Sequence, residues 1–555
     1  MDVYVLLSIV LGLSAFVSLL FMKMGFSHVA GYLIAGVFLS VAFRGEVEVY
    51  KDALKFFSEI AITLLVFEIG REIGIRGVRD LKFLPLAILI FEIFTAFLLA
   101  VILGNLMELN TMEVLVLATV GSFSSTAVIF KLLSHLNFEE DVKRVVLSVM
   151  ILEDICAMII LAILPQFAGG VHVFEVLRLI FFALAVTASL VFFGITLLNR
   201  IFEKVIKPDE IGVSVAISSA FLFAMISKFF GLSPALGAFS AGIALSMHPR
   251  NVEIGEYLRP VRELFLILFF VSLGLEAGLP GEISLLLIFT PLLIILGRFY
   301  AFSASSWIFS KRSLSECIRL GFLATSVGEF GMIIAYEAMK LGLVGREFLS
   351  ISAVGVILGT LVSSKLSQKI EYAEKISSLV PTELKALVDI VSINISRVLE
   401  SKGGEFVRLL VLRIARNVVA VLVFSITASA SLYVLDLFVP ELKYVNLAFV
   451  FAIVFATILL VSIRTKNHVE EICSLLVEKR GLDPKIRRVL SGLTFAFIML
   501  MSLNLVVLVS GRFFVEIVKE ALMLPISSGF ATVIFLLTFS LSFYYIYREI
   551  RKLQI

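Results

Sequence analysis

Apolar stretches of about 20 residues recur along the chain, and each is long enough to cross a bilayer as an α-helix. The composition agrees, because 60% of the 555 residues are hydrophobic and only 16% are charged. Soluble proteins are roughly half apolar and about a quarter charged. We therefore predict an all-α polytopic membrane protein. The net charge of +3 is too small to indicate a nucleic-acid partner.

Charged residues and Gly/Pro breaks divide these stretches into about seventeen predicted spans. Thirteen lie near residues 3–22, 28–43, 53–70, 83–104, 112–134, 144–166, 173–198, 211–230, 233–247, 260–279, 283–309, 314–341 and 348–364, and four more near 409–435, 445–463, 489–510 and 524–547. Lys and Arg gather in alternate connections, which places the N-terminus outside and the C-terminus in the cytoplasm. We expect a plasma-membrane location. The first stretch follows Asp2 rather than a basic segment, so we expect a retained span and not a signal peptide.

The chain repeats itself at a spacing of about 205 residues. The segment "GYLIAGVFLS" from Gly31 matches "GAFSAGIALS" from Gly237, and "EIAITLLVFEIGRE" from Glu59 matches "ELFLILFFVSLGLE" from Glu263. The matching spans are an odd number of spans apart, so the two copies have opposite orientation. Inverted repeats, here over about 27–165 and 233–370, are typical of secondary transporters. The alternative is chance similarity between spans rich in Gly, Ala and Leu.

Two predicted spans contain polar interruptions at equivalent positions of the two repeats. They read "TVGSFSSTAVIF" at 119–130 and "TSVGEFGMIIAY" at 325–336. We predict two broken, crossing helices, whose free carbonyls and half-helix ends can coordinate a cation or meet a charge. Small residues also serve tight helix packing, which is the alternative for the glycines. Packing gives no reason for the carboxylate of Glu329.

A pair of acids, Glu153 and Asp154, lies within the apolar run "VMILEDICAMII". Carboxylates at this depth are costly and mark ion pathways by default. Adjacent helical residues diverge by about 100°, so one acid of the pair faces the ion. We predict that Asp154 holds either a proton or a monovalent cation and that Glu153 is its partner. The expected additional oxygen ligands are Ser124, Ser125 and Thr126.

Arg298 is a basic residue within a predicted span. A guanidinium stays protonated in proteins, so Arg298 cannot carry the exchanged proton. We expect it to compensate the charge of Glu153 or Glu329, with a purely architectural ion pair as the alternative. Glu68 and Glu92 are further acidic candidates inside predicted spans.

Six segments in this order resemble the monovalent cation:proton antiporter-2 family, which includes bacterial Na⁺/H⁺ antiporters and glutathione-gated potassium-efflux proteins. They are "FEIGREI" at 67–73, "GSFSSTAVIFKLL" at 121–133, "LEDI" at 152–155, "SPALGAFSAGIALS" at 233–246, "LFFVSLGLEAG" at 268–278 and "SVGEFGMII" at 326–334. The resemblance covers residues 1–370. It implies a thirteen-span antiporter fold, usually a homodimer, in which a core domain moves against a dimerisation domain. The family's essential carboxylate, crossing-helix glutamate and basic residue match Asp154, Glu329 and Arg298.

One departure from the family concerns the residue before the carrier aspartate, which is Glu153 here and commonly Asp, Asn or Gln in the family. A second carboxylate is typical of electrogenic members, whereas an arginine like Arg298 is typical of electroneutral ones. Pairing of Glu153 favours electroneutral exchange, and the sequence leaves the stoichiometry open. The resemblance implies no cofactor beyond the transported Na⁺ or K⁺ and H⁺.

The C-terminal third has no G-x-G-x-x-G motif of a nucleotide-binding domain. We predict a cytoplasmic amphipathic linker helix within 371–408, with its apolar face at 382–400, and a four-span membrane domain at 409–555. Regulation, dimer support and docking of a regulatory partner are all open as roles for this domain.

The leading hypothesis is an antiporter that exchanges Na⁺ or K⁺ for H⁺ by alternating access. A receptor or scaffold built on a transporter-like fold and a gated K⁺ channel are the alternatives. We expect no enzyme, because no nucleophile–base pair, HExxH motif or phosphate loop is visible. The sequence does not separate Na⁺ from K⁺.

Overall fold

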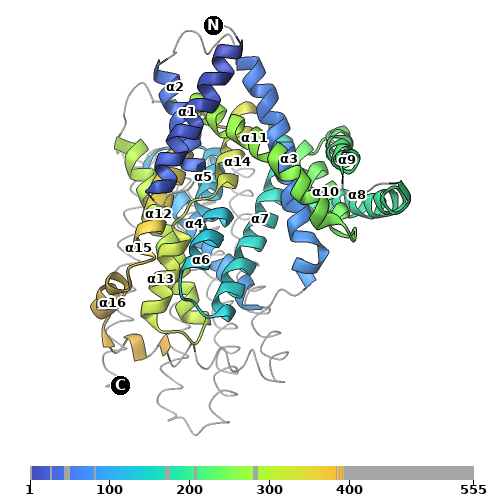
Figure 1. Cartoon of the computed structure of the whole chain (residues 1–555). Coiled ribbons are helices and arrows are strands. Elements are labelled where there is room, and N and C mark those ends of the chain that lie inside the picture. Colours follow the sequence, from blue (N-terminus) through green and yellow to red (C-terminus); the bar gives the residue numbers. More distant parts are fainter. Residues whose placement is uncertain are drawn as a thin grey trace, which may run out of the picture. The chain divides into compact units, whose positions relative to one another are not determined.

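The computed structural model describes residues 3–24, 28–42, 51–79, 83–168, 176–205, 209–278 and 285–382, with a few more residues up to 392 (Figure 1). The four predicted C-terminal spans and most of the predicted amphipathic helix at 382–400 lie outside these residues. The described part of the chain is helical and contains no β-sheet; its one β-bridge joins Ser124 to Val327.

The sixteen described helices have bounds close to the predicted spans. They are α1 (Val3–Lys23), α2 (His28–Ala42), α3 (Lys51–Arg79), α4 (Phe83–Leu106), α5 (Thr111–Ser122), α6 (Thr126–His135), α7 (Glu140–Ala168), α8 (Val176–Val205), α9 (Glu210–Phe229), α10 (Pro234–Ser246), α11 (Asn251–Ala277), α12 (Leu285–Phe309), α13 (Leu314–Ala324), α14 (Glu329–Lys340), α15 (Arg346–Leu366) and α16 (Ile370–Leu379).

Two features of these bounds bear on the predictions. The polar interruptions at 119–130 and 325–336 are breaks, since α5 gives way to α6 in the first and α13 to α14 in the second. Helix α11 begins at Asn251 rather than near 260 and contains Pro260. Its first turns are amphipathic, with Ile254 and Leu258 buried between exposed charged residues, so a boundary drawn at the charges comes too late.

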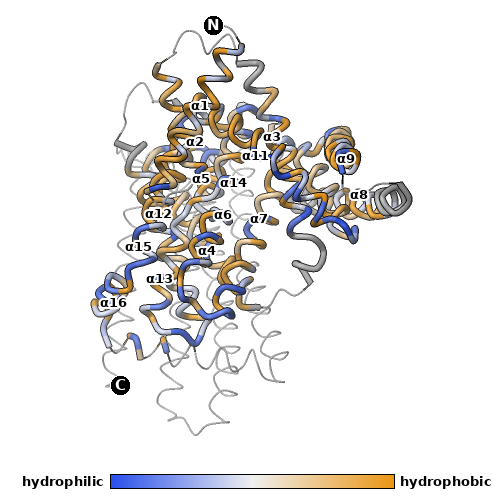
Figure 2. Tube along the Cα trace, in the orientation of Figure 1, coloured by the Kyte–Doolittle hydropathy of each residue, from blue (hydrophilic) through white to orange (hydrophobic). Residues whose placement is uncertain are grey.

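Five described helices are long and apolar enough to cross a membrane on their own. They contain Leu84–Leu106, Glu140–Ala168, Glu210–Phe229, Phe289–Phe309 and Arg346–Leu366. Hydrophobic residues cover most of α1 and α9 (Figure 2). On α9, large apolar side chains such as Leu222, Met225 and Phe229 are exposed, as expected for a helix that faces lipid.

Four helices, α2, α3, α10 and α11, pack closely and are called the scaffold helices below. Figure 1 shows α3 beside α10 and α11. Gly36 of α2 meets Gly274 of α11, and a Cβ on Gly36 would lie 2.9 Å from the Cα of Gly274. A Cβ on Gly242 of α10 would overlap the carbonyl oxygen of Phe67 on α3. Gly36 and Gly242 occupy equivalent positions of the predicted repeat, so equivalent glycines make equivalent backbone contacts.

The chain divides into two compact units. The first comprises Met1–Ala100, Asn110–Ser306 and Ser315–Lys375, and it contains the broken helices and the scaffold helices. In the second, the indole Nε1 of Trp307 donates a hydrogen bond to Oδ1 of Asp389 at 2.9 Å.

Candidate functional site

The segments that interrupt the two broken helices are extended and pair with each other. Ser124 and Val327 form an antiparallel bridge, and the backbone N–H of Ser125 donates to the carbonyl of Ser326 at 3.0 Å. Exposed backbone polar groups are costly away from water. Each interruption therefore supplies hydrogen-bond partners for the other at the depth where the helices stop.

The crossing needs glycines on the side of α14. The N–H of Gly328 donates to the carbonyl of Phe123 at 2.8 Å, and a Cβ on Gly328 would overlap the Ser124 carbonyl. A Cβ on Gly331 would lie 2.9 Å from the Cα of Val120. Tight packing, the alternative considered for these glycines, therefore applies to Gly328 and Gly331.

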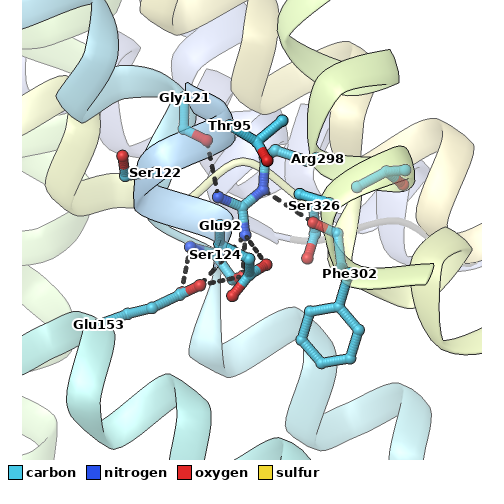
Figure 3. A network of polar contacts seen from close by, with 12 residues as sticks. Glu92, Thr95, Gly121, Ser122, Ser124, Glu153, Arg298, Phe302 and Ser326 are labelled. Carbon is cyan, nitrogen blue, oxygen red and sulfur yellow. Dashed lines mark hydrogen bonds and ion pairs between the residues drawn. The ribbon is translucent and has the colours of Figure 1, made fainter. Parts of the chain in front are cut away.

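The guanidinium of Arg298, on α12, joins the C-terminal ends of both first half-helices. Its Nε donates to the Ala324 carbonyl at the end of α13 at 2.8 Å, and its Nη1 donates to the Gly121 carbonyl near the end of α5 at 2.9 Å (Figure 3). Helix C-termini leave carbonyls unpaired and carry partial negative charge. Arg298, which is 3% exposed, compensates both ends with one positive charge.

Glu153 of α7 is fully buried against Arg298 and the first interruption. Its Oε2 accepts from the backbone N–H of Ser124 at 2.6 Å, and its Oε1 lies 3.3 Å from Nη2 of Arg298. The Ser124 hydroxyl accepts from Nη2 of Arg298 and donates to Oε1 of Glu153 at 3.2 Å. Of the two acids named as partners for Arg298 from the sequence, the structure thus brings Glu153 to the guanidinium.

Asp154 and Glu329 lie instead at the N-terminal ends of the second half-helices. The Thr126 hydroxyl, at the start of α6, lies 3.3 Å from Oδ2 of Asp154. The Ser125 hydroxyl donates to Oε2 of Glu329, the first residue of α14, at 3.1 Å. Helix N-termini carry partial positive charge and favour carboxylates or other anions.

The hydroxyls predicted from the sequence therefore serve three different carboxylates. Thr126 contacts Asp154, Ser125 contacts Glu329, and Ser124 contacts Glu153. The crossing pairs the two negative helix ends with one arginine and the two positive ends with carboxylates. Asp154 is 6% exposed, and no described basic side chain forms a salt bridge with it. Among the described residues, Asp154 is thus a buried carboxylate without a fixed counter-ion.

Glu92 of α4 belongs to the same polar network, although no partner for it was predicted from the sequence. It is 2% exposed, and its Oε1 lies 3.8 Å from Nη2 of Arg298 (Figure 3). Neither of its carboxylate oxygens has a hydrogen-bond partner among the described residues. The sequence signal was an acid inside a predicted span, but nothing in the sequence linked 83–104 to 283–309.

A second group of ion pairs connects the scaffold helices. Arg71 donates to both carboxylate oxygens of Glu68, at 2.8 and 2.6 Å, as their shared helix face predicts. Arg262 of α11 lies 3.4 Å from Glu68. Each of these charges has a fixed partner, in contrast to Asp154.

Comparisons with known proteins match the same part of the chain. The model of the family "Sodium/hydrogen exchanger, transmembrane" matches residues 9–367. A putative K⁺ efflux antiporter, KefB of Alkalimonas amylolytica, is 26% identical over 361 residues, which are 64% of this chain and 54% of that protein. The Na⁺/H⁺-K⁺ antiporter GerN of Bacillus cereus is 25% identical over 351 residues, which are 61% of this chain and 89% of that protein.

A solved structure, of the sodium/proton antiporter MjNhaP1 from Methanocaldococcus jannaschii, superposes with a TM-score of 0.49 and 16% identity. The superposition covers 68% of this chain and 97% of that one. The family assignment rests on the sequence match to the family model, which spans about two-thirds of the chain. The chain therefore belongs to the sodium/hydrogen exchanger family of monovalent cation:proton antiporters.

Proposed function

We propose that this protein exchanges Na⁺ or K⁺ for H⁺ across the membrane and that the two ions compete for Asp154. One observation carries the proposal: Asp154 is a buried carboxylate at the helix crossing without a salt bridge to a described basic residue. Its neighbour Glu153 has Arg298 as a counter-ion. A buried carboxylate without a fixed counter-ion needs either a proton or a cation.

The exchange step is balanced at this one group. Protonated Asp154 is neutral, and Asp154 with a bound monovalent cation is also neutral, so a cation that binds at Asp154 displaces the proton of that group. The oxygen atoms of Thr126, Ser125 and Glu329 are available as further ligands beside the carboxylate. Oxygen ligands at the ends of interrupted helices suit hard monovalent cations.

The two relatives named above support both cations as candidates. One is a putative K⁺ efflux antiporter and the other is a Na⁺/H⁺-K⁺ antiporter. The chain spans about half the length of the first and nearly nine-tenths of the second. The proposal therefore keeps Na⁺ and K⁺ as the candidate substrates.

Alternating access requires that one part of the protein moves against another. We propose that the helices of the crossing move against the scaffold helices, whose backbones are in contact at glycines. In this proposal residues 1–370 form a thirteen-span antiporter unit, N-terminus outside, that assembles as a homodimer in the plasma membrane. The segment 371–408 is a linker, and 409–555 is a separate four-span domain that faces the cytoplasm at its C-terminus.

The test is cation-induced dissipation of a pH gradient in proteoliposomes, with Na⁺, K⁺ and Li⁺ in turn. We expect dissipation with wild type and none with Asp154→Asn. Asp141→Asn is the matched control, because Asp141 lies on the same helix with an exposed side chain and should leave exchange unchanged.

Three results would contradict the proposal. Exchange that survives Asp154→Asn would remove Asp154 from the mechanism. No response of wild type to any cation would favour the receptor or scaffold. Cation flux that is independent of the pH gradient would favour the gated K⁺ channel.

A further inference from the structure

Arg298 faces two buried carboxylates that come from different helices. Glu153 of α7 lies 3.3 Å from its Nη2, and Glu92 of α4 lies 3.8 Å from the same nitrogen. The three side chains are each at most 3% exposed. One buried positive charge therefore lies beside two carboxyl groups that can each carry a negative charge. An uncompensated charge is costly when it is buried.

The two carboxylates are not equivalent in the described state. Glu153 accepts three hydrogen bonds, from the N–H and hydroxyl of Ser124 and from Arg298. Glu92 accepts none from the described residues. The charged and titratable groups that face Glu92 are Arg298 from α12 and Glu153 from α7. The hydrogen bonds thus stabilise a negative charge on Glu153 and offer no such stabilisation to Glu92.

We propose that Glu92 is a second proton-binding carboxyl of the exchange cycle. It replaces Glu153 as the ion-pair partner of Arg298 when Glu153 turns to the transported cation. The proposal rests on the function proposed above and deepens it. Arg298 keeps its position throughout, because its bonds to the Gly121 and Ala324 carbonyls do not depend on either carboxylate.

In this step two protons leave and one cation enters, so the net charge of the four side chains and the bound cation changes from zero to −1. Before cation binding, Asp154 and Glu92 are protonated and Glu153 is paired with Arg298. After binding, Asp154 and Glu153, which are neighbours on α7, share one monovalent cation, and deprotonated Glu92 is paired with Arg298. Two protons leave for each cation that binds, so the exchange is electrogenic. The sequence favoured electroneutral exchange because Glu153 was expected to stay paired with Arg298. That reason no longer holds if Glu92 can pair with Arg298 instead.

The experiment measures the pH gradient that balances a cation gradient in proteoliposomes. The voltage is held at zero by a permeant ion that the protein does not transport, and the probe is Na⁺ or K⁺, whichever drives exchange in wild type. A tenfold cation gradient balances about one pH unit when one proton is exchanged and about half a unit when two are exchanged. We expect about half a unit for wild type and about one unit for Glu92→Gln.

Glu113→Gln is the matched control, with an expected balance at half a unit. Glu113 lies in the exposed N-terminal capping box of α5, where Gln can replace Glu. Glu92→Asp, which keeps the carboxyl group, should also keep the two-proton balance.

A wild-type protein in which a tenfold cation gradient balances about one pH unit would overturn the inference. An unchanged balance in Glu92→Gln would also overturn it, and so would a folded Glu92→Gln variant without exchange, because Asp154 alone should still exchange one proton. These results leave competition at Asp154 intact. Absence of any exchange by wild type, with either cation, would instead overturn the proposed function and this inference with it.

Discussion

The scaffold helices and the helix crossing both bring backbones into contact, but by different physical means. In the scaffold, Gly36 and Gly242 let helices approach because they lack side chains. At the crossing, glycines also permit the approach, yet the helices end there, and Arg298 and the carboxylates compensate the exposed helix ends. The close backbone approach in the scaffold thus depends on the lack of side chains, whereas the helix ends at the crossing also need charge compensation. Substitutions in the first should change stability, and substitutions in the second should change ion coupling as well.

The largest expected effect on stability comes from Arg298→Met. The change leaves Glu153 buried without its counter-ion and frees two helix-end carbonyls. Removing one partner of a buried ion pair costs about 3–5 kcal/mol. The measurement is the free energy of unfolding of the full chain in detergent micelles, by denaturant titration.

The double variant Arg298→Met with Glu153→Gln sharpens this prediction. Replacing both members of a buried pair by neutral residues is often nearly neutral, so the double variant should recover part of the loss. A single variant as stable as wild type would contradict charge compensation at the crossing.

A smaller effect is expected for Gly242→Ala in the scaffold. The new Cβ would overlap the Phe67 carbonyl and lie 2.8 Å from the backbone nitrogen of Arg71. Overpacking typically costs about 1–3 kcal/mol. The same unfolding titration should detect the loss, while the pH gradient that balances a cation gradient should stay at the wild-type value.

Gly12→Ala on α1 is the matched control, because no atom of the described residues lies within 4 Å of its added Cβ. We expect unchanged or slightly higher stability, since a helical glycine costs roughly 0.5–1 kcal/mol relative to alanine. Equal losses in Gly242→Ala and Gly12→Ala would show that close backbone approach is not what the scaffold glycine provides.

The sequence predicted the helices and their two breaks well, because both depend on local patterns. Apolar stretches of span length predict the helices, and Gly, Ser and Thr at membrane depth predict where α5 and α13 end. The pairing of Glu153 with Arg298 was among the expected alternatives, since a buried guanidinium needs a carboxylate.

Two contacts between distant segments could not be predicted from the sequence. Glu92 and Arg298 are brought together by the packing of helices far apart in the chain, and no local pattern encodes that packing. The division of Ser124, Ser125 and Thr126 among three carboxylates has a similar origin. It follows from the antiparallel bridge to Val327, which fixes the direction of each side chain.

Competition between a proton and a cation at Asp154 is the central claim. The most direct test is the apparent Kd of Na⁺ and of K⁺ for the purified full chain, measured by equilibrium binding at a series of pH values. Competition predicts that the apparent Kd rises as the pH falls, by about tenfold per pH unit for each proton displaced. An apparent Kd that is the same at every pH would contradict the claim.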